Sequence, residues 1–260
     1  MVDQFITREF VLRALSALVM VPLAVSSLYV GGALFHGLVL AMACVMALEW
    51  SSVTSISQRG PMAPLVFVVA LVVAVSVSNM QLSLVLWPIG ALFLIFFAQP
   101  NRRQVHVMGY AYITIPALAL ISLRGEPTKG FSLLLILMVV VWCADTFAYL
   151  GGRLIGGPKL WPSISPSKTW AGAVAGFAAG LLGGYILCVL GYDVGSCLLV
   201  SAILALASIM GDLLESFFKR FYGQKDSSSF IPGHGGLLDR VDGIVVSAPL
   251  LWLLVYLEIA

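Results

Sequence analysis

Charged residues are scarce in this chain. Asp, Glu, Lys and Arg together make up 10% of its 260 residues, whereas about 25% is usual in a soluble globular domain. Hydrophobic residues make up 60%, and the mean hydropathy is +1.03. This composition excludes an ordinary soluble domain, and a net charge of only +2 argues against a nucleic-acid partner. We expect most of the chain to lie in lipid.

The chain also lacks CxxC pairs, internal repeats, low-complexity tracts and any soluble domain boundary. Its cysteines lie in or beside apolar stretches, so neither a disulfide framework nor a zinc site is expected. They are Cys44, Cys143, Cys188 and Cys197. We interpret them as small core residues, and we expect one integral membrane domain over residues 1–260.

Nine apolar stretches are long enough to be membrane spans, which need about 20 mostly apolar residues each. The first is too long for a signal peptide and has no clear cleavage site, so we expect it to be retained. The sequence predicts an all-α polytopic membrane protein, a bundle of about nine transmembrane helices whose cytoplasmic loops carry the active site. Merging at the short breaks 31–32 and 79–81 would reduce the count to eight. The expected spans are 10–30, 33–53, 62–79, 81–98, 106–123, 131–151, 170–190, 195–214 and 243–259.

The Lys and Arg residues are unevenly divided between the two sides of this arrangement. With nine spans and a cytoplasmic N-terminus, twelve of the fourteen fall on one side, and only Arg124 and Lys129 fall on the other. Loops retained in the cytoplasm carry an excess of positive residues, and one missed span would reverse every later loop. The distribution therefore favours nine spans, with 152–169 and 219–243 on the cytoplasmic face, which in a bacterium means the inner membrane.

Four of the acidic residues in or at the ends of predicted spans are candidates here, because an ionisable side chain in a span is costly and often functional. Glu49 is a secondary candidate, because a carboxylate at the interface is commonly solvated or paired. Asp145 lies inside the sixth span and fits a functional or a structural role equally. Asp212 and Glu215 are the strongest, since i,i+3 spacing places both on one helix face. Glu215 also lies four residues before Lys219, which fits a simple ion pair.

A second pair of acids, Asp239 and Asp242, repeats the i,i+3 spacing where the ninth span begins. The two pairs flank one loop: the first pair precedes the segment 219–243, the second lies near its end, and cations alternate with acids along the segment. Mg²⁺ is usually held by one or two carboxylates with phosphates and water, and Arg and Lys suit phosphate contacts. The segment therefore predicts a site for a metal and phosphates. Its other candidate residues are Lys219, Arg220, Lys225, Asp226, His234, Gly235, Gly236 and Arg240.

Three of these candidates have specific interpretations. Gly235 and Gly236 permit the backbone to approach a ligand closely with its N–H groups available. His234 is either part of the site or a loop histidine that packs locally.

The segment 152–169 forms a second polar loop. Its three prolines favour an extended, stiffened chain over a helix. Ser165, Lys168 and Thr169 follow at the start of the seventh span. Helix N-termini bind anions through unpaired N–H groups, so these residues are candidate phosphate or nucleotide contacts. A capped helix start with a surface lysine explains them almost as well.

The stretch from Ser216 to Asp242, SFFKRFYGQKDSSSFIPGHGGLLDRVD, resembles the signature of the phosphatidate cytidylyltransferases, also called CDP-diglyceride synthases. Three further segments support the resemblance: GDLLES just upstream, and ADTFAYLGGR followed by SPSKTWAG. The similarity covers about 142–243. The chain departs from the family pattern at Ser167, Ala171 and Phe147, where Lys, Glu and Gly are usual.

The resemblance implies an enzyme of phospholipid biosynthesis that joins CTP and phosphatidic acid to give CDP-diacylglycerol and pyrophosphate, using Mg²⁺ and in some arrangements a second cation. The family's metal-binding aspartates correspond to Asp212 and Asp239, within a catalytic half over about 131–260 that follows N-terminal spans over about 10–123. Homodimers are implied in the same way. The expected catalytic residues are Lys219, Lys225, Asp226, His234, Arg240, Asp242 and Asp145. The expected substrate-binding residues are Ser165, Lys168, Thr169, Arg220, Gly235 and Gly236.

Three alternatives explain less of the sequence. An intramembrane aspartyl protease would use Asp145 and Asp212, but its GxGD pattern needs glycine where this chain has Ile209. A transporter predicts charges near the membrane midplane and internal repeats, whereas the charges here cluster at one face. A lipid or polyprenol kinase is the nearest alternative and differs in which nucleotide phosphorus is attacked.

Overall fold

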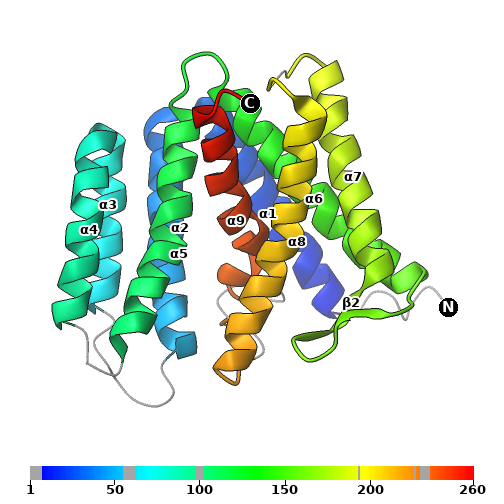
Figure 1. Ribbon diagram of the computed structural model, residues 1–260, viewed down its shortest axis with the longest axis horizontal. Coiled ribbons are helices and arrows are strands. Elements are labelled where there is room, and N and C mark those ends of the chain that lie inside the picture. The colour runs from blue at the N-terminus through cyan, green and yellow to red at the C-terminus, as the bar shows by residue number, and fades with distance from the viewer. Residues whose placement is uncertain (1–7, 55–62, 98–101, 193, 225–226, 229–234) are drawn as a thin grey trace. The chain divides into compact units, whose positions relative to one another are not determined.

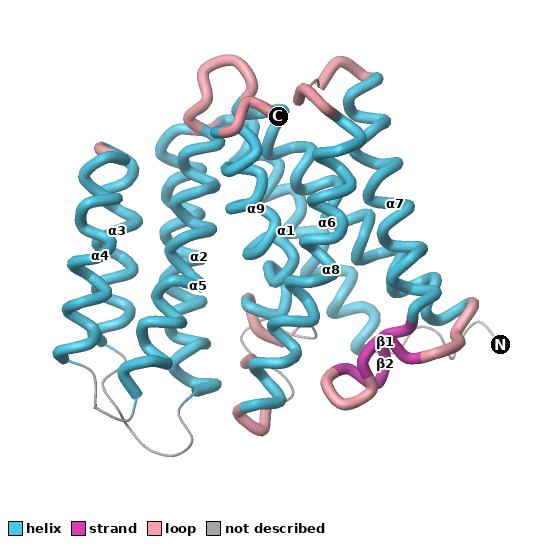
Figure 2. The backbone as a smooth tube through the Cα atoms, viewed as in Figure 1, coloured by secondary structure: helices cyan, strands magenta, loops and turns pink. Residues whose placement is uncertain are grey.

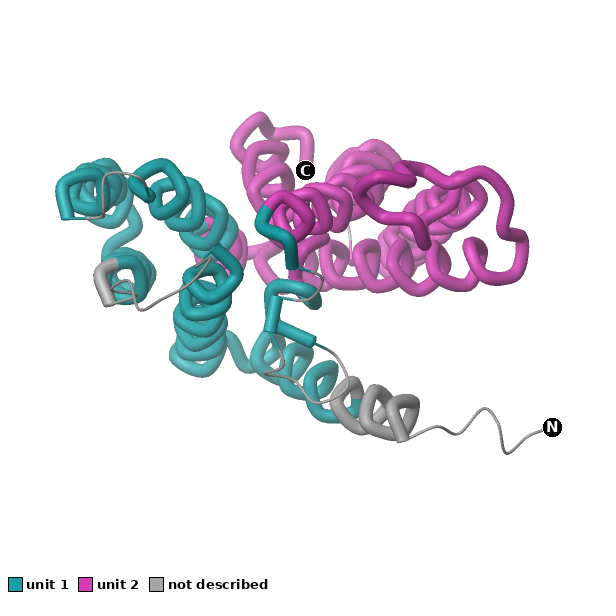
Figure 3. The backbone as a smooth tube through the Cα atoms, turned by 90° about the horizontal axis from the view of Figure 1, so that it is seen from below, with its two compact units in different colours: residues 1–118, 222–240 teal, residues 119–221, 241–260 magenta. Residues whose placement is uncertain are grey.

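The computed structural model describes residues 8–54, 63–97, 102–192, 194–224, 227–228 and 235–260. Within this part of the chain it has nine helices and one two-stranded sheet (Figures 1 and 2). The chain divides into two compact units (Figure 3). Unit 1 comprises Met1–Leu118 and Tyr222–Arg240, and unit 2 comprises Ala119–Phe221 and Val241–Ala260.

Unit 1 contains four helices and most of a fifth. They are α1 (Arg8–Val30), α2 (Gly32–Thr54), α3 (Ala63–Ser78), α4 (Met80–Phe97) and α5 (Arg103–Arg124). Consecutive helices pack together from α1 to α4. Two tryptophans tie α5 to this group: Trp50 donates from Nε1 to the Val105 carbonyl at 3.1 Å, and Trp87 donates from Nε1 to Thr114 Oγ1 at 2.8 Å.

Unit 2 contains the remaining helices and the sheet. They are α6 (Gly130–Leu154), β1 (Lys159–Trp161), β2 (Ser165–Thr169), α7 (Trp170–Val189), α8 (Cys197–Phe221) and most of α9 (Leu238–Tyr256). A stripe of glycines at every fourth position lets α7 pack closely on its neighbours. A Cβ on Gly176 would lie 2.6 Å from the Ala144 carbonyl of α6, and one on Gly180 would lie 2.9 Å from Ala205 Cβ of α8. The α6–α7–α8 layer is therefore built on backbone-to-backbone proximity.

Six helices, α2, α4, α5, α6, α7 and α8, are long and apolar enough to cross a membrane. Two shorter apolar segments, Leu18–Val30 and Leu65–Ser78, accompany them. The prediction of a polytopic helical membrane protein is confirmed. Each of the nine described helices corresponds to one expected span, and the breaks at Gly31 and Asn79 do separate helices. The single-domain expectation stays a prediction.

Three sequence-based expectations need correction. Within the segment 152–169, α6 continues to Leu154, and 159–169 forms an antiparallel hairpin rather than a single extended stretch, in which Lys159 opposes Thr169 and Trp161 opposes Ser165. The eighth helix continues to Phe221, and its last turns, ESFFKRF, mix charged with aromatic residues beyond the uniformly apolar run. Lys219 and Arg220 therefore lie on α8 rather than in a loop.

The third correction concerns cysteine pairing. Cys188, at the end of α7, and Cys197, at the start of α8, form a disulfide across the short connection between these helices, with Cα atoms 6.5 Å apart. This separation lies within the usual range for disulfides. Cys44 and Cys143 are unpaired, as expected. Cys188 and Cys197 lie near the facing ends of two consecutive predicted spans, and this placement was the signal in the sequence for the disulfide. Because the two residues do not form a CxxC motif, their pairing was not predicted from the sequence.

Candidate active site

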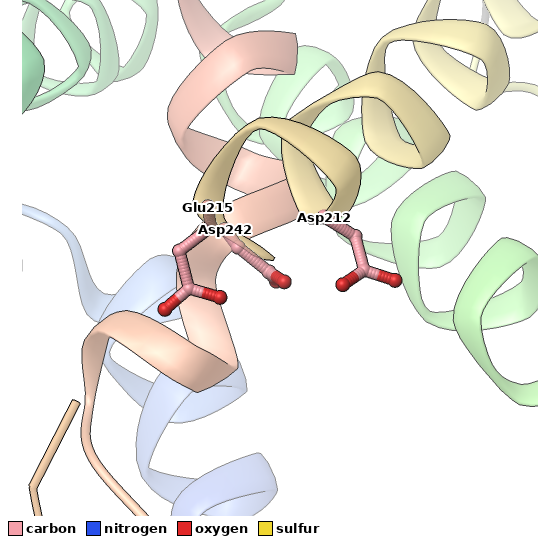
Figure 4. Close-up of side chains that lie close together, drawn as sticks. All are labelled: Asp212, Glu215 and Asp242. Atoms are coloured by element: carbon pink, nitrogen blue, oxygen red, sulfur yellow. The ribbon is translucent and has the colours of Figure 1, made fainter. Parts of the chain in front are cut away.

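Three carboxylates gather in unit 2. Asp212 and Glu215 come from α8 and Asp242 comes from α9, and each offers an oxygen within 4.8 Å of the others. Figure 4 shows the three carboxyl groups close together. Glu215 is 4% exposed and Asp242 8% exposed, whereas the Asp212 side chain is 40% exposed. The cluster therefore has two buried acids and one that solvent reaches.

Two glycines make this approach of α8 and α9 possible. Gly211 faces the backbone of α9 so closely that a Cβ there would overlap the Asp242 carbonyl oxygen. A Cβ on Gly243 would lie 2.6 Å from Ser208 Oγ and 3.0 Å from Val141 Cγ1. Since any side chain at either position would separate the helices, the glycines bring Asp242 next to the i,i+3 acids of α8.

Cations balance part of the negative charge. Lys219 Nζ donates to Glu215 Oε2 at 2.9 Å, the i,i+4 pair that the sequence suggested. Lys168 reaches from β2 to Asp212 Oδ2, with 2.5 Å between the charged atoms, in an ionic contact that is not aligned as a hydrogen bond. Helix spacing does not reveal this partner of Asp212, because Lys168 lies 44 residues earlier in the chain.

The remaining negative charge of the cluster has its largest effect on Asp242. It precedes the apolar part of α9, and its Oδ1 accepts one hydrogen bond, from the Gly243 N–H at 2.8 Å. Burial, followed by the neighbouring carboxylates of Asp212 and Glu215, raises the pKa of Asp242 well above its ordinary value. A bound cation would remove this repulsion, because opposite charge favours the ionised form.

The β1–β2 hairpin is held beside these acids by two polar contacts besides the Lys168 pair. Arg220 Nε donates to the Ile164 carbonyl in the hairpin turn at 3.3 Å. Thr169 caps α7, since its Oγ1 accepts the Gly172 N–H at 3.1 Å. Ser165 is buried at the start of β2. Thus Lys168 points to the cluster, while Thr169 and Arg220 also hold the hairpin in place.

Asp145 lies on α6 and accepts a hydrogen bond from Ser208 Oγ of α8 at 3.2 Å. It is also near enough to Asp242 to disfavour ionisation there. The prediction that Asp145 contributes a polar group at the edge of the site therefore has a geometric basis, although its role stays a prediction.

The donor set of the cluster fits a hard divalent cation. Carboxylate oxygens are the ligands that Mg²⁺ prefers, and Mg²⁺ is commonly held by one or two of them with water and phosphates. Asp212 and Asp242 were both predicted site residues. For Glu215 the sequence leaves open both a functional role and a simple ion pair with Lys219, and the structure adds it to the candidate ligands. The i,i+3 spacing from Asp212 was the signal for it.

Four predicted site residues lie in unit 1, at the end of the segment 222–240. Asp239 Oδ2 accepts hydrogen bonds from Ser227 N at 3.0 Å, Ser227 Oγ at 2.8 Å and Gly236 N at 2.9 Å. Gly235, with φ of +79°, would place a Cβ 2.9 Å from the same oxygen. The two glycines therefore bring the backbone close to a carboxylate of the chain itself. Arg240 is exposed in the first turn of α9.

Three further predicted residues, Lys225, Asp226 and His234, lie outside the described residues. The metal role of Asp239 also stays a prediction, because Asp239 and Asp212 belong to different units. A residue that sequence reasoning undervalued is Glu49 of α2, which is 4% exposed and contacts the same segment in unit 1.

The fold and the cluster together define a class: a polytopic helical membrane protein with a carboxylate site, flanked by lysines, at the ends of its helices. The model of a family described as "Cytidylyltransferase family" matches residues 11–258. The chain therefore belongs to the cytidylyltransferase family. The match covers far more of the chain than the segment 142–243 on which the sequence resemblance depended.

Curated relatives are similar over the larger part of the chain. A phosphatidate cytidylyltransferase of Brucella abortus is 43% identical over 169 residues, which are 63% of this chain and 62% of the relative. Those of Rickettsia bellii and Staphylococcus saprophyticus are 39% and 41% identical over 155 and 148 residues. These matches cover 56% of this chain in each case, and 67% and 56% of the relatives. The chain thus matches about three fifths of the length of these proteins.

Proposed function

We propose that this protein is a CTP:phosphatidate cytidylyltransferase, which transfers CMP from CTP to phosphatidic acid and releases pyrophosphate. The observation that carries the proposal is the cluster of Asp212, Glu215 and Asp242 with Lys168 and Lys219 beside it. Carboxylates for a metal and lysines for phosphates are the groups that transfer between two phosphate-bearing substrates requires. Membership of the cytidylyltransferase family and the curated relatives support the same reaction.

The bond-forming step is attack of a phosphatidate phosphate oxygen on the α-phosphorus of CTP. A phosphate monoester is largely ionised at pH 7, since its second pKa is about 6, so the nucleophile needs no strong general base. The task of the protein is to position the substrates and to offset their charge. The Lys168 side chain is 23% exposed, with its Nζ buried against Asp212, and in this proposal it exchanges that contact for a nucleotide phosphate. Lys219 is held in place by Glu215.

A divalent cation such as Mg²⁺, held by Asp212, Glu215 and Asp242, would supply positive charge to the nucleotide phosphates. Asp239 stays a predicted ligand on the family pattern, and Lys225, Asp226, His234 and Arg240 stay predicted contributors. The homodimer is likewise a prediction.

We also place the site on the cytoplasmic face, where CTP is available. Twelve of fourteen cationic residues fall on that side of the predicted topology. The disulfide gives independent support. It joins the far ends of α7 and α8, and α7 separates it from Lys168 by 20 helical residues, or about 30 Å. Disulfides persist in oxidising compartments outside the cytoplasm.

To test the reaction, purified protein is incubated with phosphatidate, Mg²⁺ and CTP labelled at a known phosphorus, and the products that carry the label are identified. Label at the α-phosphorus should enter the lipid, and the β and γ label should leave as pyrophosphate. Transfer of the γ label to lipid, with release of CDP, would instead identify a lipid kinase. Absence of both products would reject the proposed function.

A further inference from the structure

Glu49 is a buried acid in an apolar helix. It lies on α2, one of the six candidate membrane spans, and is 4% exposed. A carboxylate so placed is costly unless it is hydrogen-bonded, and polar residues inside spans are a functional hypothesis by default. Among the described residues, its hydrogen-bond donors all belong to unit 1 and to the segment 222–240.

The Glu49 carboxylate accepts three hydrogen bonds from that segment. Oε1 accepts Ser228 Oγ at 2.6 Å and Leu237 N at 2.9 Å, and Oε2 accepts Leu238 N at 2.8 Å. Leu238 is the first residue of α9. The first N–H groups of a helix have no partner within the helix, and a negative charge there is favourable to the helix dipole. Glu49 thus caps α9 from a helix that lies almost two hundred residues earlier in the chain.

The local packing leaves little freedom around this cap. A Cβ on Gly236 would lie 2.9 Å from each oxygen of Glu49 and would overlap Ser227 Oγ. Ser227, next to Ser228, is bound in turn by Asp239 through its N–H and hydroxyl. Two carboxylates, Glu49 and Asp239, therefore hold residues 227–228 and 236–238 in place, and the second of these stretches leads into α9.

The residues that follow the cap are the ones the reaction needs. Asp239 and Asp242 lie in the first two turns of α9, and Asp242 is a member of the carboxylate cluster. We propose that Glu49 is a positioning residue: through Ser228, Leu237 and Leu238 it fixes the start of α9 and so the placement of the metal-binding carboxylates on that helix. The catalytic consequence of this inference rests on the proposed function. The hydrogen bonds by which Glu49 caps α9 do not depend on it.

The test uses Glu49→Gln in the full-length protein. The amide keeps the size of the side chain but removes the charge and directs an NH₂ group at one backbone donor. Glu126→Gln is the matched control, since Glu126 is exposed in the turn between α5 and α6. Two measurements are made: the Mg²⁺ concentration for half-maximal CDP-diacylglycerol formation, and hydrogen exchange of peptides covering Leu237 and Leu238.

Glu49→Gln should raise the half-saturating Mg²⁺ concentration about tenfold or more, as expected for loss of hydrogen bonds to a charged group. Exchange at the start of α9 should accelerate, and Glu126→Gln should change neither quantity. General destabilisation would lower the yield of folded protein without shifting the Mg²⁺ dependence of the protein that remains. A Glu49→Gln protein that matches Glu126→Gln in both measurements overturns the proposal.

The experiment distinguishes failure of the proposed function from failure of the proposed role of Glu49. If the wild type makes no CDP-diacylglycerol, the proposed function fails, while hydrogen exchange at the start of α9 still decides whether Glu49 caps this helix. If Glu49→Gln does not fold, Ser228→Ala provides the test, because it removes one of the three donors and keeps the charge. It should shift the metal dependence and the exchange in the same direction but less, and wild-type values for Ser228→Ala would then count against the proposal.

Discussion

Replacing Lys168 by Met should have opposite effects on metal and on nucleotide. In the absence of substrate, Lys168 contacts Asp212 and competes with any cation for that carboxylate. The side chains are 23% and 40% exposed, so solvent weakens the pair to the range of about 0.2–1 kcal/mol typical of exposed ion pairs. Removing Lys168 should therefore tighten binding of Mn²⁺ alone by up to about fivefold.

The nucleotide should respond in the other direction. If Lys168 moves to a CTP phosphate during the reaction, its loss removes a charge-assisted hydrogen bond worth about 1.5–3 kcal/mol. The value of kcat/KM for CTP should then fall about 10- to 150-fold. Lys159→Met is the matched control, because Lys159 is an exposed lysine of the same hairpin and should leave both quantities near wild type.

The assays are Mn²⁺ titration by electron paramagnetic resonance without nucleotide, and initial rates of CDP-diacylglycerol formation at varied CTP. A Lys168→Met protein with weaker Mn²⁺ binding would show that the lysine supports the metal rather than competing with it. An unchanged kcat/KM for CTP would refute the nucleotide role of Lys168.

Two other predictions concern the scaffold and the topology. Gly176→Leu should destabilise the protein by more than about 1–3 kcal/mol, the usual cost of overpacking, because the Ala144 carbonyl leaves no room for a side chain. Val174→Leu, at a 64% exposed position of the same helix, is the control and should not destabilise it. Thermal unfolding in detergent measures both. With Cys44 and Cys143 replaced by Ser, spheroplasts treated with a membrane-impermeant reductant should expose Cys188 and Cys197 to an impermeant maleimide. Labelling that requires lysis would place the disulfide, contrary to expectation, on the cytoplasmic side.

The helices could be predicted from the sequence because each apolar run long enough to cross lipid must satisfy its backbone hydrogen bonds internally. The pairing of 159–169 as a hairpin could not, since three prolines indicate an extended chain without indicating its partner. The end of α8 was also misplaced, because charged residues interrupt the apolar run in its last turns, ESFFKRF, and hydropathy marks only the uniformly apolar part.

The candidate site was predictable in composition but not in its contacts. The i,i+3 spacing put Asp212 and Glu215 on one helix face, and the signature put Asp242 nearby. That Asp242 joins them depends on the close fit of Gly211 and Gly243 between α8 and α9, which no local pattern reveals. The cap that Glu49 provides is even less visible, since its partners follow it by about 180 residues.

The central claim is that the α8 and α9 carboxylates hold the divalent ion for cytidylyl transfer. Mg²⁺-dependent incorporation of CMP from CTP into phosphatidate by membranes containing equal amounts of inserted wild type or Asp242→Asn tests it most directly. Asp242→Asn should lower this incorporation at least about 100-fold, and Asp212→Asn should do the same, because each removes a charged ligand from a shared site. Turnover near that of the wild type in Asp242→Asn, with unchanged Mg²⁺ dependence, would contradict it.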